Sequence, residues 1–314
     1  MPVAVRPLTI DQLDDAERVF RLAFGTFLGL REPLQFTGDC AYVRTRWLAD
    51  PSAAWAAHLD DTLAGSNFAT RWGSFAFFGP LSVRPEWWER GIARHLLDAT
   101  MQRFAEWGVG HTGLYTFAQS PKHVALYQRY GFFPQYLTAI ASKNVVAAAG
   151  AVTPDECRSA LISAHRAATL RECAELTDAI FAGLDVTREI DAVQEQALGD
   201  TLLLRDDGAL RGFAVCHLGP GTEAGGGVCY VKFAAVAPGA KAAMHFERLL
   251  ALCDRYAALR GAAQIVAGVN TARAPAYQAL LAHGYRSYAQ GVAMQRPNDP
   301  GFNRPDVWIL DDWR

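Results

Sequence analysis

The chain contains an internal repeat, and this feature restricts its architecture more than any other. The segment from Leu81, "LSVRPEWWERGIARHLLDATMQRFAEWG", aligns without a gap on the segment from Ala234, "AAVAPGAKAAMHFERLLALCDRYAALRG". Pro85 then matches Pro238, and the separation of 153 residues holds throughout this alignment. One ancestral unit of about 150 residues therefore occurs twice in the 314-residue chain.

A second match follows each of these segments. "SPKHVALY" ends at Tyr127 and "NTARAPAY" ends at Tyr277, 150 residues later, because the intervening loop has lost three residues. Strand-like runs such as "LAGSNFATRW" and "SFAFFGPLSV" precede the first match. A helix with one buried face should follow, since Leu97, Met101 (or Thr100), Phe104 and Trp107 recur at helical spacing. A strand, a short helix with the tyrosine and a closing strand complete the unit.

This order of elements predicts two domains, residues 1–148 and residues 149–314, with the junction near residue 148. Each domain is long enough to bury a core of its own. Helices and strands alternate in both, so the fold class is α/β (α+β). Beyond the junction, Thr153-Pro154-Asp155-Glu156 has the pattern of a cap and a first helical turn.

Composition excludes several classes of protein. A net charge of −2 offers no broad basic surface, so we expect no nucleic-acid partner. The longest wholly apolar stretches fall far short of the roughly 20 residues that span a bilayer. The first residues turn acidic where a signal peptide would turn apolar, so we expect a cytoplasmic protein without a membrane partner. Six scattered cysteines without a CxxC pair indicate buried, reduced thiols, and no metal is expected.

The stretch "PEWWERGIARHLL" places small residues at the start of a helix. The first N–H groups of a helix lack intrahelical partners, and the helix dipole leaves partial positive charge there. Gly91 and Ala93, with Ile92 between them, leave these donors open, and Arg90 and Arg94 add positive charge. We therefore expect a phosphorylated ligand to contact the main chain at this turn.

Two common phosphate-binding loops are excluded. No GxxxxGK[ST] sequence occurs. The Gly-rich "GPGTEAGGG" from Gly219 runs from strand to strand, whereas a dinucleotide-binding loop runs from strand to helix. We interpret this segment as a long hairpin loop.

With these features the sequence resembles the GNAT superfamily of acetyl-CoA-dependent N-acyltransferases. The family signature [QR]xxGx[GA] lies at the start of the helix after the fourth strand, and residues 88–93 here read Trp-Glu-Arg-Gly-Ile-Ala. Both small residues match, while Trp88 replaces the leading Gln or Arg. Val83-x-Pro85 upstream and "LYQRYGF" downstream complete the match. The resemblance implies two tandem GNAT folds, each a mixed, mostly antiparallel sheet with a splayed centre and flanking helices.

The resemblance also implies where acetyl-CoA, the acyl donor, would bind. The fourth and fifth strands of the family part to admit the pantetheine arm, and Leu81 and Val83 would here offer main-chain groups to it. An N–H group near Ser82 or Val83 would polarise the thioester carbonyl. Gly79-Pro80 suits such a break in the strand, and it suits an ordinary turn equally well.

Tyr127 occupies the general-acid position of the family. A phenol with a pKa of roughly 10 keeps its proton at neutral pH and can donate it to the departing thiolate; the alternative is a core aromatic. Ser120 stands where many members have an Asn that contacts the cofactor, and His123 would line the cofactor cleft. The general base stays open between a chain of water molecules and these candidates: His58, Asp60, Asp61, Glu86 and His123.

The second copy has lost the open helix start. Residues 90–93 become Ala243, Met244, His245 and Phe246, and the apolar side chains of Met244 and Phe246 would desolvate a phosphate without replacing its hydration. We expect this copy to bind acetyl-CoA poorly or not at all, to pack on the first domain and to shape the acceptor pocket. The tail "NDPGFNRPDVWILDDWR" should cross to the first half. Asn270, Arg273 and Tyr277 keep the old spacing, and the pocket candidates, each with an ordinary structural role as the alternative, are His217, Glu223, Lys232 and His245.

The sequence thus predicts an acyltransferase that moves an acetyl group from acetyl-CoA to a primary amine by direct attack. Catalysis would lie in residues 1–148, in a monomer or homodimer, with a small-molecule or peptide acceptor that the sequence does not identify. The alternative is a non-catalytic, acyl-CoA-binding or regulatory protein that keeps the cofactor cleft. Catalysis in the second copy is a third reading, and Met244 and Phe246 argue against it.

Overall fold

The structure is a computed structural model that describes residues 2–146 and 150–314. The junction expected near residue 148 lies outside the described residues, and the division of the chain there stays a prediction. The capped turn after it is confirmed, because Thr153 and Glu156 form a capping box around a short 3-10 helix, Pro154–Glu156.

From the strands in the middle of each copy to its closing strand, the elements follow the predicted order. The first copy consists of β1 (Ala4–Pro7), α1 (Leu13–Phe27), α2 (Tyr42–Ala49), β2 (Ala54–Leu59), β3 (Thr62–Trp72), β4 (Phe75–Phe78), β5 (Ser82–Val83), α3 (Ile92–Glu106), β6 (His111–Thr116), α4 (Pro121–Gln128) and β7 (Phe133–Asn144). The second consists of α5 (Ser163–Ile180), α6 (Thr187–Glu195), β8 (Gly199–Asp206), β9 (Ala209–Gly219), β10 (Gly225–Val236), α7 (Ala242–Leu259), β11 (Gln264–Asn270), α8 (Ala274–Ala282), β12 (Arg286–Arg296) and β13 (Ile309–Leu310).

The strands of both copies form one continuous sheet. Its order is β1-β2-β3-β4-β6-β12-β7-β11-β10-β9-β8, with β5 on β3 and β13 on β10. Most neighbours are antiparallel, and the parallel pairs are β4 with β6 and β10 with β11. The mixed, mostly antiparallel sheet expected from the sequence is confirmed.

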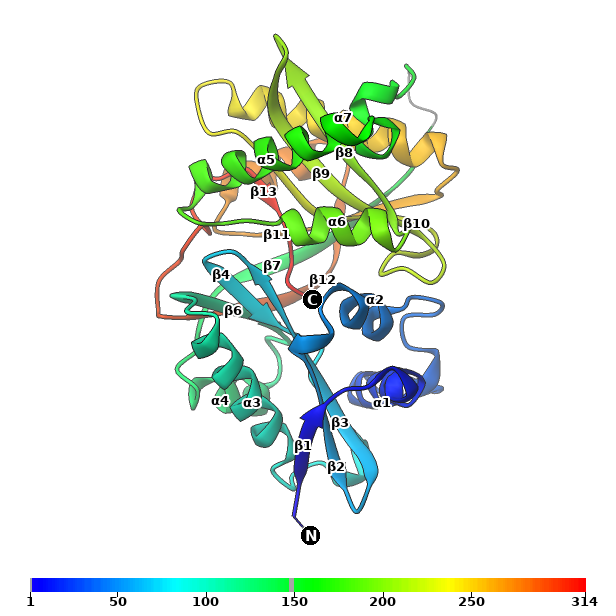
Figure 1. The fold of residues 1–314 in the computed structure, drawn as a ribbon, viewed down its shortest axis with the longest axis vertical. Coiled ribbons are helices and arrows are strands. Elements are labelled where there is room, and N and C mark those ends of the chain that lie inside the picture. Colours follow the sequence, from blue (N-terminus) through cyan, green and yellow to red (C-terminus); the bar gives the residue numbers. More distant parts are fainter. Residues whose placement is uncertain (1, 147–149) are drawn as a thin grey trace.

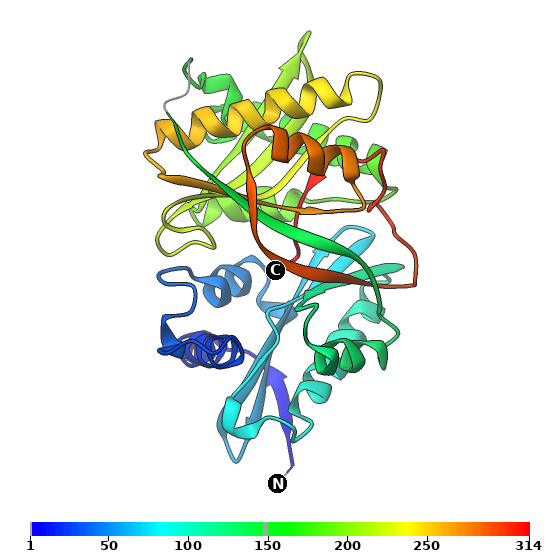
Figure 2. The same cartoon turned by 180° about the vertical axis from the view of Figure 1, so that it is seen from behind.

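The closing strands of the two copies are exchanged, which the sequence did not predict. Strand β12 of the second copy pairs with β6 of the first, and β7 of the first copy pairs with β11 of the second. The two exchanged strands also pair with each other, and Thr138 lies opposite Gly291, its equivalent 153 residues later. Figure 2 shows both strands crossing between the halves of the molecule. Each half of the sheet is thus completed by a strand from the other half of the chain.

Helices cover both faces of the sheet. In the first copy α1 and α2 lie on one face, and α3 and α4 lie on the other (Figure 1). Helix α3 buries Leu96, Leu97, Thr100 and Phe104. Met101 and Thr100 are the alternatives that the sequence leaves for one position of this buried face, and Thr100 is the buried residue. Its hydroxyl accepts a hydrogen bond of 2.7 Å from Asn67 Nδ2. A polar partner on β3 therefore explains a threonine on an otherwise apolar face.

One hydrophobic cluster joins the two copies. Trp72 and Phe75 of the first copy pack with Phe233 of the second and with Trp313 of the tail. The ring centroids of Phe75 and Trp313 are 4.9 Å apart. The tail thus crosses onto the first half, as expected, and the copies share part of their core.

Two further expectations concern membranes and cysteines. Among the helices of the described residues, none is long and apolar enough to span a bilayer. All six cysteines are free. Cys173, Cys216, Cys229 and Cys253 are buried as predicted, whereas Cys40 and Cys157 are only half-buried.

Candidate functional site

The fourth strand of the first copy is broken at Gly79-Pro80. Strand β4 runs parallel to β6 as far as the pair Phe78–Leu114, and β5 then pairs with β3 instead. Gly79 has φ 144°, a conformation that residues with side chains rarely adopt. Of the two readings of Gly79-Pro80, the break within the strand is confirmed. In the described residues, the edge of β5 away from β3 carries no strand.

Helix α3 begins next to this break with an open first turn. Gly91 is its N-cap at φ 79°, and a side chain built on Gly91 would meet no atom within 4 Å. Arg90 and Arg94 are exposed, and Ala93 is half-buried. The first-turn N–H groups therefore face space that a phosphate could enter, with two guanidinium groups nearby.

The two residues Trp88 and Glu89, in the loop before Gly91, bond neighbouring elements. Trp88, at the position of the family's Gln or Arg, donates from its indole Nε1 to the carbonyl oxygen of Val83 at 2.7 Å. Glu89 pairs with Lys122 of α4, with 2.9 Å between carboxylate oxygen and ammonium nitrogen. The loop that precedes α3 is thus tied to β5 and to α4.

Tyr127 lies on α4 and packs against the last residue of β4. Its ring meets the ring of Phe78 edge-on, with 5.6 Å between centroids, and only 8% of the residue is exposed. Burial raises the pKa of Tyr127 to about 12, and a hydrogen bond from the Thr116 side chain opposes this to a smaller extent. The phenol is therefore protonated at neutral pH, as a general acid must be.

Ser120 and His123 occupy the start of α4. Ser120 is the N-cap, and its hydroxyl accepts a hydrogen bond of 3.4 Å from the His123 main-chain N–H. Burial, with a smaller contribution from Lys122, lowers the pKa of His123, whose ring packs on Phe27 at 4.9 Å. Ser120 therefore has a structural role whether or not it also contacts a cofactor.

The candidate bases are widely separated. Asp60 and Asp61 form the turn of the β2–β3 hairpin, at the end of the sheet near the N-terminus (Figure 1). His58 is buried on β2 and bonds Gln12 at 2.9 Å between side-chain nitrogens. Glu86 is exposed and lies 3.8 Å from Arg84. Of the five candidates, His123 shares α4 with Tyr127.

In the second copy, Met244 and Phe246 were both expected to block the start of the helix, but their side chains lie in different places. Met244 is 43% exposed in the first turn of α7, so its side chain can cover the helix start. Phe246 is fully buried and packs inward, with its ring 5.2 Å from that of Trp308. The expectation that Phe246 faces an incoming anion is wrong, because its apolar ring is buried in the core of the second copy. His245 is buried beside Asp206 at 3.5 Å.

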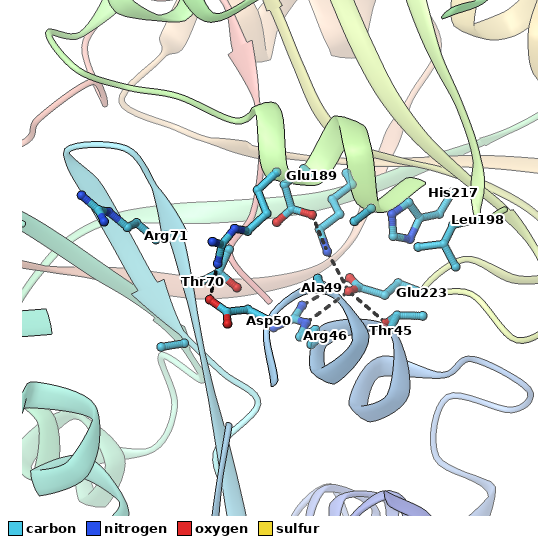
Figure 3. Close-up of a pocket in the computed structure, with 14 residues that line it drawn as sticks. Thr45, Arg46, Ala49, Asp50, Thr70, Arg71, Glu189, Leu198, His217 and Glu223 are labelled. Carbon is cyan, nitrogen blue, oxygen red and sulfur yellow. Dashed lines mark hydrogen bonds and ion pairs between the residues drawn. The ribbon is translucent and has the colours of Figure 1, made fainter. Parts of the chain in front are cut away.

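A pocket lies on the seam between the copies (Figure 3). It is small, with a cavity volume of about 20 Å³, and it lies between α2 and β3 of the first copy and α6, β9 and β10 of the second. Three of the four pocket candidates, His217, Glu223 and Lys232, line it, and His245 does not. Glu223 comes from the Gly-rich segment, which forms the β9–β10 hairpin loop as expected.

The pocket is lined by a buried network of charges. Glu223 accepts hydrogen bonds from Arg46 Nε at 3.1 Å and Lys232 Nζ at 2.7 Å, and Lys232 also pairs with Glu189 at 3.4 Å. Burial acts to raise the pKa of Glu223, but Arg46 and Lys232 together hold it well below its usual value. The carboxylate therefore stays ionised and fastens α2 to the second copy.

Arg46, which sequence reasoning did not single out, links two parts of this site. Its Nη1 donates to the carbonyl oxygen of Gly79 at 2.5 Å, and its Nη2 also reaches Glu223 and the main-chain oxygen of Arg314. This one side chain connects the seam pocket to the break in the fourth strand. The surrounding segment, "YVRTRWLA", carries no pattern that distinguishes Arg46 from Arg44.

The fold of the first copy, with its broken fourth strand beside the open start of α3, is that of an acyltransferase domain, and the second copy repeats the fold. Residues 17–132 match the model of the acetyltransferase (GNAT) family. The first copy is therefore a GNAT domain, and the resemblance noted in the sequence is confirmed. Members of this family transfer acyl groups from acyl-CoA.

Solved structures show that the two-copy architecture recurs. A protein from Pyrococcus horikoshii described as an acetyltransferase aligns over 99% of this chain and 95% of its own, with TM-score 0.67 and 15% identity. A GCN5-related N-acetyltransferase from Sphaerobacter thermophilus aligns over 94% and 95%, with TM-score 0.63 and 14% identity. These identities establish a shared fold. A search of curated proteins gave no significant match.

Proposed function

We propose that residues 1–148 transfer an acetyl group from acetyl-CoA to the primary amine of a small molecule or peptide, with Tyr127 as general acid. The observation that carries the proposal is the position of Tyr127. Its protonated phenol packs on Phe78, where β4 parts from β6, and α3 begins nearby with an open first turn.

The acyl donor would occupy the broken strand and the start of α3. Its pantetheine amides would pair with Leu81 and Val83, and its pyrophosphate would meet the main chain from Arg90 to Arg94. Ser120 and His123 would border it on α4. The strand-free edge of β5 and the open space at Gly91 support this placement.

The chemistry is a direct transfer. The neutral amine attacks the thioester carbonyl carbon, and the carbonyl oxygen gains charge that an N–H group of Ser82 or Val83 would stabilise. As the C–S bond breaks, Tyr127 donates its proton to the sulfur, which leaves as the thiol of CoA. The attacking nitrogen gives up a proton to water or to a base, and the phenolate of Tyr127 is reprotonated from solvent.

The acceptor would approach from the side of α2 and the second copy. Arg46 bonds both Gly79 and Glu223, so the seam pocket is one side chain away from the break in the strand. In this proposal the second copy does not bind acetyl-CoA and forms part of the acceptor side.

The test is release of CoA by the full chain with acetyl-CoA and a panel of amines, including amino acids, polyamines and peptides. The wild type should release CoA with at least one amine. Tyr127→Phe should lose most of its kcat at low and high pH alike while keeping its affinity for acetyl-CoA. A wild type that binds acetyl-CoA but never releases CoA would instead be a non-catalytic acyl-CoA-binding protein.

A further inference from the structure

The tail of the chain forms a strand in the second copy. Strand β13 pairs antiparallel with β10, with Ile309 opposite Ala235 and Leu310 opposite Ala234. At this point β10 has already parted from β11, whose last paired residue is Ala267 opposite Val231. The tail therefore lies in the gap that opens between the fourth and fifth strands of the second copy.

The two copies part at equivalent residues. Residues 228–231 pair with 264–267 in the second copy, and residues 75–78 pair with 111–114 in the first, each 153 residues earlier. Ala234 and Ala235, which carry the tail, are thus the equivalents of Leu81 and Ser82. The main-chain N–H of Val236, the equivalent of Val83, donates to the oxygen of Trp308 at 3.3 Å.

Side chains of the second copy hold the tail from the helical side. Arg273, just before α8, is fully buried and donates to Ile309 O at 2.9 Å, Asn303 Oδ1 at 2.5 Å and Asp311 Oδ1 at 2.8 Å. Arg273 is the N-cap of α8 as Ser120, 153 residues earlier, is the N-cap of α4, and Ser120 would border the expected cofactor site. The ring of Trp308 packs on Phe246 at the first turn of α7, the equivalent of Ala93.

We propose that the second copy has kept its cofactor cleft as a peptide-binding site whose ligand is the chain's own segment 307–311. The segment adds a strand to β10 where the pantetheine arm would pair in the first copy. The comparison with acyl-CoA rests on the function proposed above, whereas the occupancy by the tail does not. Beyond this segment the tail reaches the first copy, where Trp313 packs on Phe75.

This arrangement has two consequences for the second copy. A strand bound in its cleft excludes acyl-CoA, so one chain binds one acyl-CoA molecule. The same strand fixes the path of the tail across the seam, from Arg273 to the face of the first sheet.

Hydrogen–deuterium exchange on the full chain, with and without acetyl-CoA, tests the proposal at equivalent places in the two copies. Amides of residues 308–311 and of Val236 should exchange slowly and equally in both samples. Amides of residues 81–83 should exchange at least tenfold more slowly with acetyl-CoA. Fast exchange at 308–311 in the free chain, or an increase there with acetyl-CoA, would overturn the proposal. No change at residues 81–83 would count against the proposed function alone.

Two variants examine how the tail is held. Arg273→Met removes its three hydrogen bonds to residues 303–311, so exchange at 308–311 should rise at least tenfold. Trp308→Ala removes the packing of this ring on the core of the second copy, including Phe246, but keeps the main-chain pairing, so it should raise exchange there to a smaller extent. It keeps the test available if Arg273→Met does not fold. Arg248→Met, on α7 and bonded to Asp206, is the matched control without an effect at 308–311. Unchanged exchange at 308–311 in both tail variants would refute the role assigned to these residues.

Discussion

The indole Nε1 of Trp88 donates a hydrogen bond of 2.7 Å to the carbonyl oxygen of Val83. Val83 ends β5, and its carbonyl is one of the groups expected to pair with the pantetheine arm. Trp88 stands where the family has Gln or Arg. In this chain the residue at that position therefore binds the strand itself, at a group that an acyl-CoA molecule would also use.

Replacing Trp88 should change the affinity for acetyl-CoA. If the pantetheine arm takes over the Val83 carbonyl, the hydrogen bond from Trp88 must be given up, at a net cost of about 1 kcal/mol. Trp88→Phe keeps the apolar ring and removes the donor, so acetyl-CoA should bind about fivefold more tightly. Isothermal titration calorimetry of the full chain measures this difference.

The neighbouring Trp87 provides the control. It is also half-buried, and its ring lies 5.7 Å from the Arg84 guanidinium carbon. Trp87→Phe should leave the dissociation constant within twofold of the wild type. Equal or weaker binding in Trp88→Phe would show that acetyl-CoA does not compete for the Val83 carbonyl.

The open turn at Gly91 can be tested by substitution, and the equivalent residue of the second copy provides the control. A side chain at φ 79° costs roughly 1–2 kcal/mol, and a tryptophan would also fill the space in front of the first-turn N–H groups. Gly91→Trp should weaken acetyl-CoA binding at least tenfold more than Gly91→Ala does, since Gly91→Ala carries the backbone cost alone. Thermal-shift titration with acetyl-CoA reports both values.

Met244 is the equivalent of Gly91, 153 residues later. Met244→Trp should leave the acetyl-CoA-dependent thermal shift unchanged, because in the proposed function the second copy does not bind acetyl-CoA. A loss of the shift in Met244→Trp together with its survival in Gly91→Trp would place the acyl-CoA site in the second copy.

The repeat explains why so much of each copy was predictable. Periodicity and spacing located the strands and the buried face of α3, where Leu97 and Phe104 are both buried. These signals are local, because a helix face or a strand is encoded within a few consecutive residues. The break at Gly79-Pro80 and the capped turn at Thr153 could be predicted for the same reason, because each depends on a few consecutive residues.

The exchange of β7 and β12 was not predictable from such signals. Both strands would present the same apolar pattern whether they closed their own copy or the other one, since the two edges they join are related by the repeat. Arg46 was missed because it bonds groups that are brought close only by folding. The tail was expected to cross, but nothing in "VWIL" indicates that it adds a strand to β10.

The Glu223 network should contribute strongly to stability. Glu223 is almost fully buried between Arg46 and Lys232, and Glu223→Gln leaves these cations without their main carboxylate partner. Breaking a buried ion pair in this way costs about 3–5 kcal/mol. Urea unfolding at pH 7 should show a loss in the free energy of unfolding of this size.

An exposed ion pair supplies the comparison. Arg44 and Asp14 lie on the surface at 3.1 Å, so Asp14→Asn should cost less than about 1 kcal/mol. Similar losses in Asp14→Asn and Glu223→Gln would contradict the view that the seam network fastens the two copies together.

His217 should make the stability depend on pH. Its ring is buried in the seam pocket, neither ring nitrogen has a hydrogen-bond partner within the described residues, and Tyr230 meets the ring edge-on at 6.2 Å. Burial, aided by Lys232, lowers the pKa of His217 to about 3, whereas an unfolded histidine titrates near 6.5. Above pH 6.5 both states are neutral and the group has no effect on stability. As the pH falls below 6.5, only the unfolded chain takes up the proton, so the folded state is progressively disfavoured.

The expected size follows from one proton per chain. Between pH 7 and pH 5 the free energy of unfolding should fall by about 2 kcal/mol on account of His217. His217→Phe keeps a flat ring of similar size without a titrating group, so in urea unfolding the stability of the wild type minus that of the variant should be about 2 kcal/mol lower at pH 5 than at pH 7. Parallel pH dependence in the two proteins would mean that His217 is protonated in the folded chain, which its place beside Lys232 and Arg46 opposes.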